Sequence, residues 1–236
     1  MFPFLNDWGT VGSLVALSIA TGQKLTDDWE VIIVNDGSQK EDREALGMVV
    51  DIFNIKYDGK RIRIIDHEKN MGYGGALRSG FSASTKKLIF YTDCDGQYDP
   101  RELSFLMEKM KLGIGMVNGY KIKRNDPWVR IIAGRVYHHL VKFTFRLPIR
   151  DTDCDFRLIR AEVFEKIRLF ENTGTICVEL VKKIDHAGYK IAEVPVHHFW
   201  RTSGKSQFFN FGRLAKTGTN LVKLWWKLMV RKDYIR

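Results

Sequence analysis

The sequence predicts an α/β fold: a mostly parallel central sheet, helices on both faces of that sheet, and an amphipathic helical appendage at the C-terminus. In the first half of the chain, short apolar runs alternate with helical patterns, and each run ends in a polar loop that contains glycine. Strands separated by helices need crossover connections, which join parallel strands. Ligands of such sheets bind at the carboxyl ends of the strands, so we expect the functional residues in the loops that follow them.

The individual elements follow from the same alternation. Apolar runs predict strands at residues 30–35, 61–66 and 87–92. Helical spacing of apolar residues predicts helices near residues 10–21, 40–53 and 74–84. Later in the chain, an apolar run at residues 115–119 and a predicted strand at residues 193–196 continue the pattern.

Length and composition limit the class of protein. The 236 residues suffice for one large domain or for a core with an appendage. Hydrophobic residues make up 44% and charged residues 28%, ordinary globular values that exclude a disordered chain, a collagen-like chain and a coiled-coil rod. Lys and Arg number 38 against 28 Asp and Glu, a net charge of +10 that favours phosphates, nucleic acid or anionic lipid as partners.

The positive charge is concentrated in two segments. Residues 120–150 hold eight Lys or Arg and one acid, and residues 208–236 hold seven and one, so the rest of the chain is slightly acidic. A basic amphipathic segment is often a solvated helix face. Two such segments beside a catalytic core favour a surface for an acidic acceptor or an anionic membrane.

Cysteine usage and hydropathy bear on the compartment. The chain has three cysteines, Cys94, Cys154 and Cys177. An odd number of cysteines with no CxxC pair favours a reducing cytosol over a disulfide framework. No 18 consecutive residues are apolar, and no basic region followed by an apolar stretch begins the chain. We therefore expect a soluble or peripheral protein.

Two loops after predicted strands are acidic. Asp93 and Asp95 stand two positions apart at a strand end, so both carboxylates could face one cation. Their oxygen ligands suit Mg²⁺ or Mn²⁺. Such a metal would bind a nucleotide diphosphate. A capped D-x-D-G turn is the alternative. The loop at residues 70–76 is glycine-rich, but a tight turn before a helix is favoured over phosphate binding there.

Six motifs together resemble the signatures of the family 2 glycosyltransferases in order and interval. They are PFLND at residues 3–7, VNDGS at 34–38, NMG at 70–72, DCDGQ at 93–97, DTDCDFR at 151–157 and EVP at 193–195. The resemblance covers about residues 2–207 and is closest to the branch of dolichyl-phosphate mannose synthase and bacterial polyprenyl-phosphate glycosyltransferases. It implies a nucleotide-diphospho-sugar transferase fold of the GT-A type.

The resemblance implies a donor site. Asp36 would contact the nucleotide base or ribose, Asp93 and Asp95 would bind the metal and the sugar diphosphate, and Gln97 would line the sugar pocket. The floor of the base pocket would be formed by Pro3, Asn6 and Asp7. The apolar strand that normally precedes this motif is absent, because the chain starts at Met1, and Asp7 replaces the family's Glu. We therefore expect either that the sheet loses most of its first strand or that the sequence is a truncated start.

The segment at residues 151–157 matches the family's D-x-x-S-G-F-R, with Cys154 for Ser and Asp155 for Gly. Arg157 would project toward phosphate or organise the acceptor loop. Asp153 and Asp155 could act as general base toward a hydroxyl acceptor, or could equally cap the loop and pair with arginines. A phosphate acceptor needs no base, because it is already anionic near neutral pH.

Cations complete the implied site. Lys121, Arg124 and Arg135 are candidates for the acceptor phosphate and the donor diphosphate, with a solvated face as the alternative for each. Residues 201–206 resemble the family's R-x-x-G-x-S loop. In it, Arg201 and Lys205 would stabilise charge on the leaving nucleoside diphosphate.

From residue 208, aromatic and aliphatic residues interleave with Lys and Arg. An amphipathic helix in the interface would bring the enzyme to a lipid-phosphate acceptor. Packing of the same stripe on the catalytic domain or on a second subunit is equally plausible.

We therefore expect a catalytic domain at residues 1–207 and a basic amphipathic segment at residues 208–236. The expected activity is inverting, metal-dependent transfer of a sugar from a GDP- or UDP-sugar to a polyprenyl phosphate, at the cytoplasmic face of a membrane. The alternatives are a transferase acting on a hydroxyl of a glycan or lipid, and a non-catalytic module that binds nucleic acid or membrane. The acidic D-x-D pair has no role in such a module, so we expect no nucleic-acid partner.

Overall fold

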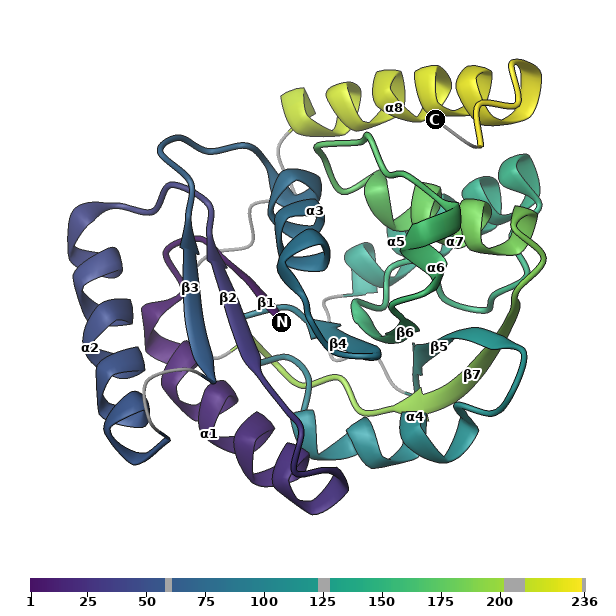
Figure 1. Cartoon of the computed structure of the whole chain (residues 1–236). Helices are drawn as coiled ribbons and strands as arrows, with labels where there is room; N and C mark the ends of the chain where they lie inside the picture. The colour runs from purple at the N-terminus through teal and green to yellow at the C-terminus, as the bar shows by residue number, and fades with distance from the viewer. Residues whose placement is uncertain (58–60, 123–127, 202–210, 235–236) are drawn as a thin grey trace.

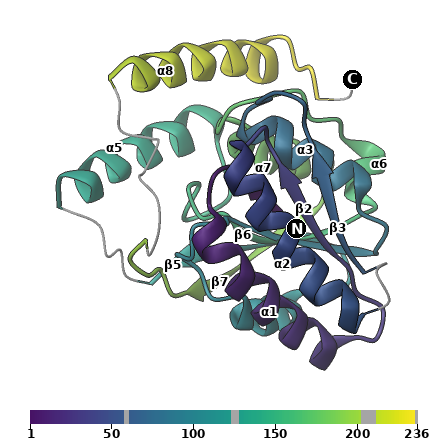
Figure 2. The same ribbon diagram turned by 90° about the vertical axis from the view of Figure 1, so that its left-hand side faces the viewer.

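The computed structural model describes residues 1–57, 61–122, 128–201 and 211–234 (Figures 1 and 2). Its strands are β1 (Phe2–Phe4), β2 (Val31–Asn35), β3 (Ile62–Asp66), β4 (Leu88–Thr92), β5 (Ile114–Lys121), β6 (Phe156–Arg160) and β7 (Lys190–Val196). The three predicted strands at residues 30–35, 61–66 and 87–92 are thus confirmed as β2, β3 and β4.

Helices connect most of these strands. They are α1 (Trp8–Leu25), α2 (Lys40–Lys56), α3 (Tyr73–Ala83), α4 (Leu103–Lys109), α5 (Trp128–Phe145), α6 (Val163–Lys166), α7 (Ile176–His186) and α8 (Phe211–Trp225). A 3₁₀ turn, Pro100–Glu102, precedes α4, and a π-helical turn, η2 (Trp226–Val230), continues α8. The expected helices at residues 10–21, 40–53 and 74–84 correspond to α1, α2 and α3.

The strands form two sheets that meet edge to edge. One has the order β1-β2-β3 with parallel pairing throughout, and the other has the order β4-β6-β5-β7. The amine of Met1 donates to the carbonyl of Phe90, and the amide of Thr92 donates to the carbonyl of Met1, so β1 lies beside β4. Strand β6 is antiparallel to both β4 and β5, whereas β5 and β7 are parallel. The sheet is therefore mostly parallel, as the sequence predicts, with β6 reversed.

Helices cover both faces of the sheet (Figure 1). On one face, α1 and α2 pack on β1, β2 and β3, and α4 packs on β5, β6 and β7. On the other face, α3, α5, α6 and α7 enclose the largest cluster of buried apolar residues. Because both faces are covered, the central strand β2 is buried at all five positions and its sequence, VIIVN, is a nearly continuous apolar run.

The first strand is short. It has three residues, all buried, and pairs in register with the end of β2, Phe4 opposite Asn35. This pairing places the loop after β1 beside the loop after β2. The carboxyl end of β4 lies next along the sheet, so three motif loops meet at one edge.

The C-terminal helix packs on the rest of the fold along one side. Leu224 and Leu228 are fully buried in the largest apolar cluster, whereas Val222 and Trp226 are 67% and 55% exposed on the outer side. In both views α8 lies near α5 at one end of the molecule (Figures 1 and 2). Within the described ranges, every helix is either too short or too polar to cross a bilayer.

Candidate active site

The carboxyl end of β4 carries the D-x-D pair. The hydroxyl of Tyr73, at the start of α3, donates to Asp93 Oδ1 at 2.7 Å. The amide of Gln97 donates to Asp95 Oδ1 at 3.0 Å, which closes a tight turn around Gly96 at φ 75°. That φ lies in the left-handed region, which glycine adopts without the penalty of a Cβ. Backbone geometry thus fixes the orientation of Asp95, and a tyrosine fixes that of Asp93.

Arg201 joins two acidic loops that are distant in sequence. Its guanidinium donates from Nη2 to Asp95 Oδ2 at 2.6 Å, and its Nη1 lies 3.7 Å from Asp7 Oδ1. Asp95 is nearly buried, with 6% of its side chain exposed, whereas the Arg201 side chain is 29% exposed. The arginine therefore faces the carboxylates on one side and solvent on the other, which suits a cation that meets an incoming anion.

A third carboxylate, Asp155, lies beside the pair. Its Oδ1 accepts a hydrogen bond from the Tyr91 hydroxyl at 3.2 Å and from Cys177 Sγ at 3.0 Å. Asp155 immediately precedes β6, and Tyr91 lies on the neighbouring strand β4, so the antiparallel pairing brings Asp155 to the D-x-D loop.

The electrostatics of these acids are mutually unfavourable. Burial raises the pKa of Asp93 well above its ordinary value, and the charges of Asp155 and Asp95 raise it further. Burial also raises the pKa of Asp95, against the opposing effect of Arg201. Burial raises the pKa of Asp7 to about 6, with Arg201 opposing and Asp95 adding to the shift. Such a group of repelling carboxylates attracts a cation, because a cation relieves the repulsion.

The donor set fits a hard divalent cation. Asp93 and Asp95 offer carboxylate oxygens, the ligand type that Mg²⁺ and Mn²⁺ prefer. In the part of the chain that the structure describes, no three His, Cys, Asp or Glu side chains form a ready ligand cluster. Two carboxylates with remaining positions for water and substrate oxygens match the way Mg²⁺ binds phosphates.

The carboxylate of Asp36 is already engaged in hydrogen bonds within the fold. It is 3% exposed, and its carboxylate accepts hydrogen bonds from the amides of Met71 and Gly72 at 2.7 and 2.9 Å. The ring of His67 bridges Asp36 Oδ1 at 2.7 Å and the hydroxyl of Ser79 at 2.9 Å. Asp36 thus holds the glycine-rich loop against the sheet, and its contact with a nucleotide stays a prediction. Sequence reasoning missed His67, which stands one residue beyond the end of β3.

The glycine-rich loop is a tight turn packed against another loop. Gly72 has φ 84°, and the amide of Gly74 donates to the carbonyl of Asn172 at 2.9 Å. A Cβ at Gly72 would lie 2.3 Å from that same carbonyl oxygen. Glycine is therefore required for close packing here, which agrees with the structural interpretation of this motif.

Arg157 and Lys121 are buried inside the fold. Arg157 is fully buried, and its guanidinium donates to Asn118 Oδ1 at 2.7 Å, to the Tyr91 hydroxyl at 2.9 Å and to the Thr152 carbonyl at 2.9 Å. Lys121 Nζ donates to the carbonyl of Asp153 at 2.6 Å and lies 3.6 Å from Asp151 Oδ2. Both cations therefore organise the loop at residues 151–157, and contact of either with phosphate stays a prediction.

The remaining predicted donor residues lie around the same edge. Pro3 is buried in β1, opposite Val34. Asn6 accepts a hydrogen bond from the Gln39 amide at 3.0 Å and so links the loops after β1 and β2. The side chain of Gln97 donates to the carbonyl of Phe199 at 3.0 Å, which ties the D-x-D loop to the segment after β7.

Three predicted cations are not placed. Arg124 and Lys205 lie outside the described residues, and Arg135 lies on α5 with its side chain outside them. Asp153 is half-buried, and its amide donates to Asp151 Oδ1 at 3.0 Å, so it takes part in a local turn.

Comparison with known proteins shows the family of the chain. The sequence profile of Glycosyl transferase family 2 matches residues 2–168, well over half of the chain. The chain is 26% identical over 250 residues to glycosyltransferase AglD of Haloferax volcanii, covering 100% of this chain and 38% of that protein. It is 28% identical over 222 residues to the undecaprenyl-phosphate 4-deoxy-4-formamido-L-arabinose transferase of Enterobacter sp. (strain 638), covering 94% of this chain and 65% of that protein. The chain thus spans less than two thirds of the length of these relatives.

Solved structures share the fold. Glucosyl-3-phosphoglycerate synthase from Mycobacterium tuberculosis, in complex with phosphoglyceric acid, superposes with a TM-score of 0.67 at 17% identity, covering 96% of this chain and 77% of that chain. The same enzyme in complex with Mn²⁺, UDP-glucose and glycerol 3-phosphate gives a TM-score of 0.66 at 18% identity, covering 98% of this chain and 78% of that chain. These likenesses show a GT-A fold. With the family profile matching from β1 through α6, the chain belongs to the family 2 glycosyltransferases.

Proposed function

We propose that this chain transfers a sugar from a nucleotide-diphospho-sugar to a polyprenyl phosphate, with a divalent metal and with inversion at the anomeric carbon. The observation that carries the proposal is the group of Asp93, Asp95 and Asp7 around Arg201 at the carboxyl edge of the sheet. The acceptor class is supported by the relative whose name specifies an undecaprenyl-phosphate transferase.

On the donor side, Asp93 and Asp95 would hold Mg²⁺ or Mn²⁺, which when bound neutralises charge on the departing diphosphate. The Tyr73 hydroxyl and the Gln97 amide orient these two carboxylates before substrate arrives. Arg201 is poised to exchange its bond with Asp95 for one with a phosphate oxygen, because its guanidinium is partly exposed. Whether the nucleotide is GDP or UDP depends on contacts with the base, for which the loops after β1 and β2 are the candidates.

On the acceptor side, a phosphate oxygen is already an anionic nucleophile and requires orientation rather than deprotonation. A second candidate function, transfer to a hydroxyl of a glycan or lipid, is favoured by one observation. Asp155 presents a carboxylate next to Asp93, oriented by Tyr91 and Cys177, where a general base would stand. Acceptor screening separates the two functions.

Membrane contact would bring the enzyme to its lipid acceptor at the cytoplasmic face. The outer side of α8 and η2 exposes Val222, Trp226 and Val230 at 67%, 55% and 44%. These two elements carry Lys and Arg but no acidic residue. An apolar stripe with cations and without acids suits an anionic bilayer surface, and this composition supports lipid rather than nucleic acid as the anionic partner.

The transfer reaction is tested by incubating the protein with GDP- and UDP-sugars, Mn²⁺ and a polyprenyl phosphate. Mass spectrometry should detect a glycosylated polyprenyl phosphate with wild type and none with Asp95→Asn. The matched control is Asp99→Asn in the same loop, where Asp99 caps the 3₁₀ turn and pairs with Arg101 on the surface. Product from glycan hydroxyls instead of polyprenyl phosphate would favour the second candidate function.

Membrane contact is tested by flotation with anionic vesicles. Val222→Glu/Trp226→Glu should abolish flotation, because it places acids on the outer side of α8. Ile52→Glu/Ile55→Glu should leave flotation unchanged, because these residues are 66% and 87% exposed on α2, which already contains acidic residues. Equal flotation of both variants would contradict membrane contact through residues 208–236.

A further inference from the structure

Arg201 contacts the same carboxylate that a divalent ion would use. Its Nη2 donates to Asp95 Oδ2 at 2.6 Å, and the amide of Gln97 donates to Asp95 Oδ1 at 3.0 Å, so both oxygens of this carboxylate are engaged. Only 6% of the Asp95 side chain is exposed, which leaves little of the carboxylate open to an ion that arrives from solvent. An ion that binds Asp95 therefore comes close to the guanidinium.

The donors around the D-x-D pair differ in their effect on an ion. The Tyr73 hydroxyl and the Gln97 amide are neutral, and a carboxylate oxygen has a second lone pair, so both hydrogen bonds can persist beside a metal. The guanidinium of Arg201 keeps its full positive charge at any ordinary pH. Because two cations on one oxygen repel each other, Arg201 is the contact that an ion has to replace.

The backbone near Arg201 is anchored to the D-x-D loop, whereas its side chain has a second carboxylate close by. The Phe199 amide donates to the Gln97 carbonyl at 2.9 Å, and the Gln97 side chain donates to the Phe199 carbonyl at 3.0 Å. Arg201 Nη1 lies 3.7 Å from Asp7 Oδ1, and 29% of the Arg201 side chain is exposed. The guanidinium can thus turn from Asp95 toward Asp7 or toward an anion from solvent while Phe199 stays in place.

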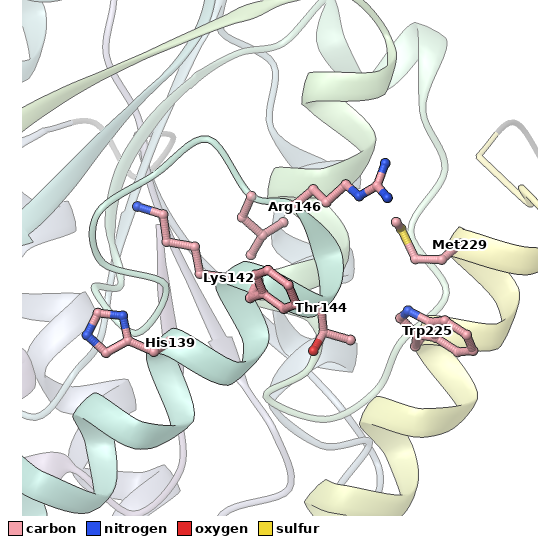
Figure 3. Close-up of a pocket in the computed structure, with 8 residues that line it drawn as sticks. His139, Lys142, Thr144, Arg146, Trp225 and Met229 are labelled. Carbon is pink, nitrogen blue, oxygen red and sulfur yellow. The ribbon is translucent and has the colours of Figure 1, made fainter.

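Two other arginines provide a comparison, because their contacts lie elsewhere. Arg101, in the segment after the D-x-D loop, is 69% exposed and lies 2.6 Å from Asp99 Oδ2. Arg146 lines the groove between α5 and the C-terminal helix (Figure 3), and none of the residues that line this groove belongs to the loops that carry the D-x-D pair and Asp7. Removal of either charge therefore lowers the net charge of the protein without removing a contact to Asp95.

We propose that Arg201 and the divalent ion compete for Asp95, so that the ion binds tightly only together with a diphosphate that draws the guanidinium away. This inference rests on the proposed function for the identity of the diphosphate. Coupling between two ligands is reciprocal, so a nucleoside diphosphate that removes Arg201 from Asp95 raises the affinity for the ion, and the ion raises the affinity for the nucleotide by the same factor. Arg201 thus makes the site select the ion and the nucleotide as a pair, and it opposes retention of the ion once the diphosphate has left.

The first test titrates Mn²⁺ into the full chain without any nucleotide and follows free Mn²⁺ by electron paramagnetic resonance. Arg201→Met should bind Mn²⁺ about fivefold more tightly than wild type, which corresponds to roughly 1 kcal/mol, the size of a partly exposed ion pair. Arg201→Gln, which keeps a polar side chain without the charge, should change the affinity in the same direction. Arg101→Met and Arg146→Met remove the same charge elsewhere and should change the Kd by less than about twofold.

The second test titrates UDP and GDP separately into the same proteins in saturating Mn²⁺, with calorimetry as the readout. The nucleotide that binds wild type should bind Arg201→Met at least about fivefold more weakly, because the variant lacks the cation that meets the phosphate. The substitution thus has opposite effects on the two ligands. A merely structural role of Arg201 would instead weaken the binding of both.

Unchanged or weaker Mn²⁺ affinity in both Arg201 variants would overturn the inference, as would an equal gain of affinity in Arg101→Met or Arg146→Met. Absence of Mn²⁺ binding in every protein would overturn the metal site and this inference with it. Tighter Mn²⁺ binding by the Arg201 variants without sugar transfer by wild type would leave the competition standing and refute the proposed function. Sugar transfer by wild type together with a Mn²⁺ affinity that is indifferent to Arg201 would do the reverse.

Discussion

Replacing Arg157 with methionine tests whether a buried guanidinium holds the loop at residues 151–157 together. The change removes hydrogen bonds to Asn118, Tyr91 and Thr152 and leaves two buried acceptors, the Asn118 amide oxygen and the Thr152 carbonyl, without their donor. Each orphaned buried acceptor costs about 1–3 kcal/mol, and relief of the guanidinium's desolvation offsets part of that. We expect a net loss of about 3 kcal/mol, or a Tm lower by about 6–12 °C for a chain of this size.

Arg160→Met on the same strand is the matched control. Arg160 is half-buried and donates to the carbonyls of Ile114 and Lys111, which water can solvate when the arginine is removed. We expect its stability to fall by less than about 1 kcal/mol. Both variants are measured by thermal and urea unfolding. Equal Tm shifts in the two variants would refute the reasoning, because the loss of stability would then not depend on whether the abandoned acceptors are buried.

Three further predictions follow from individual contacts. Tyr73→Phe removes the hydrogen bond to Asp93 Oδ1, so Mn²⁺ affinity at pH 7, measured by electron paramagnetic resonance, should fall about tenfold; unchanged affinity would show that Tyr73 does not orient the carboxylate. Glu179→Gln removes the carboxylate that lies 3.0 Å from the buried ammonium of Lys183, so the free energy of unfolding, measured in urea, should fall by about 3–5 kcal/mol. The double variant Glu179→Gln/Lys183→Met should regain part of that free energy, and a double variant less stable than the single one would contradict this. Burial raises the pKa of Asp7 from 3.8 to about 6, so the folded protein binds a proton on this carboxylate more tightly than the unfolded chain does. Wild type should therefore lose stability relative to Asp7→Asn as the pH rises from about 4 to about 6. A Tm difference between the two proteins that stays constant across that window would be inconsistent with the shift.

The parallel half of the fold could be predicted because its signal is local. Strands β2, β3 and β4 are apolar runs bounded by polar loops, and the helices between them repeat apolar residues at helical spacing. The reversal of β6 could not be predicted, because FRLIR is buried at four of its five positions and its sequence carries no information about direction. That reversal is what brings Asp155 to the D-x-D loop.

The motifs predict which loops come together better than they predict the partners of each side chain. Asp95 and Asp7, from two different motifs, both lie beside Arg201, and Asp93 is close enough to feel the charge of that arginine. Lys121 is predicted to contact phosphate, and Arg157 either to contact phosphate or to organise the loop at residues 151–157; in the structure Lys121 donates to the carbonyl of Asp153, and Arg157 donates to Asn118 and to the carbonyl of Thr152. The sequence shows that a basic residue stands at each of these positions. Whether its side chain is buried, and which atoms it contacts, depends on which loops the sheet brings together.

The helical surfaces illustrate the same limit. Amphipathicity of the C-terminal segment was evident, but not which of its residues face the protein, since Leu224 and Leu228 are buried and Trp226 is exposed. The exposed row of Val136, Leu140 and Phe143 on α5 was not anticipated, because an i, i+4, i+7 pattern is equally typical of a buried helix face.

The central claim is that Asp93 and Asp95 hold a divalent ion against the diphosphate of a sugar nucleotide. Its most direct test is calorimetric titration of GDP and UDP into the protein, with and without Mn²⁺, for wild type, Asp93→Asn/Asp95→Asn and Asp99→Asn. We predict that one nucleotide binds wild type and Asp99→Asn only when Mn²⁺ is present, and that the double variant binds neither. Nucleotide binding that is indifferent to Mn²⁺ and unchanged in the double variant would contradict the claim.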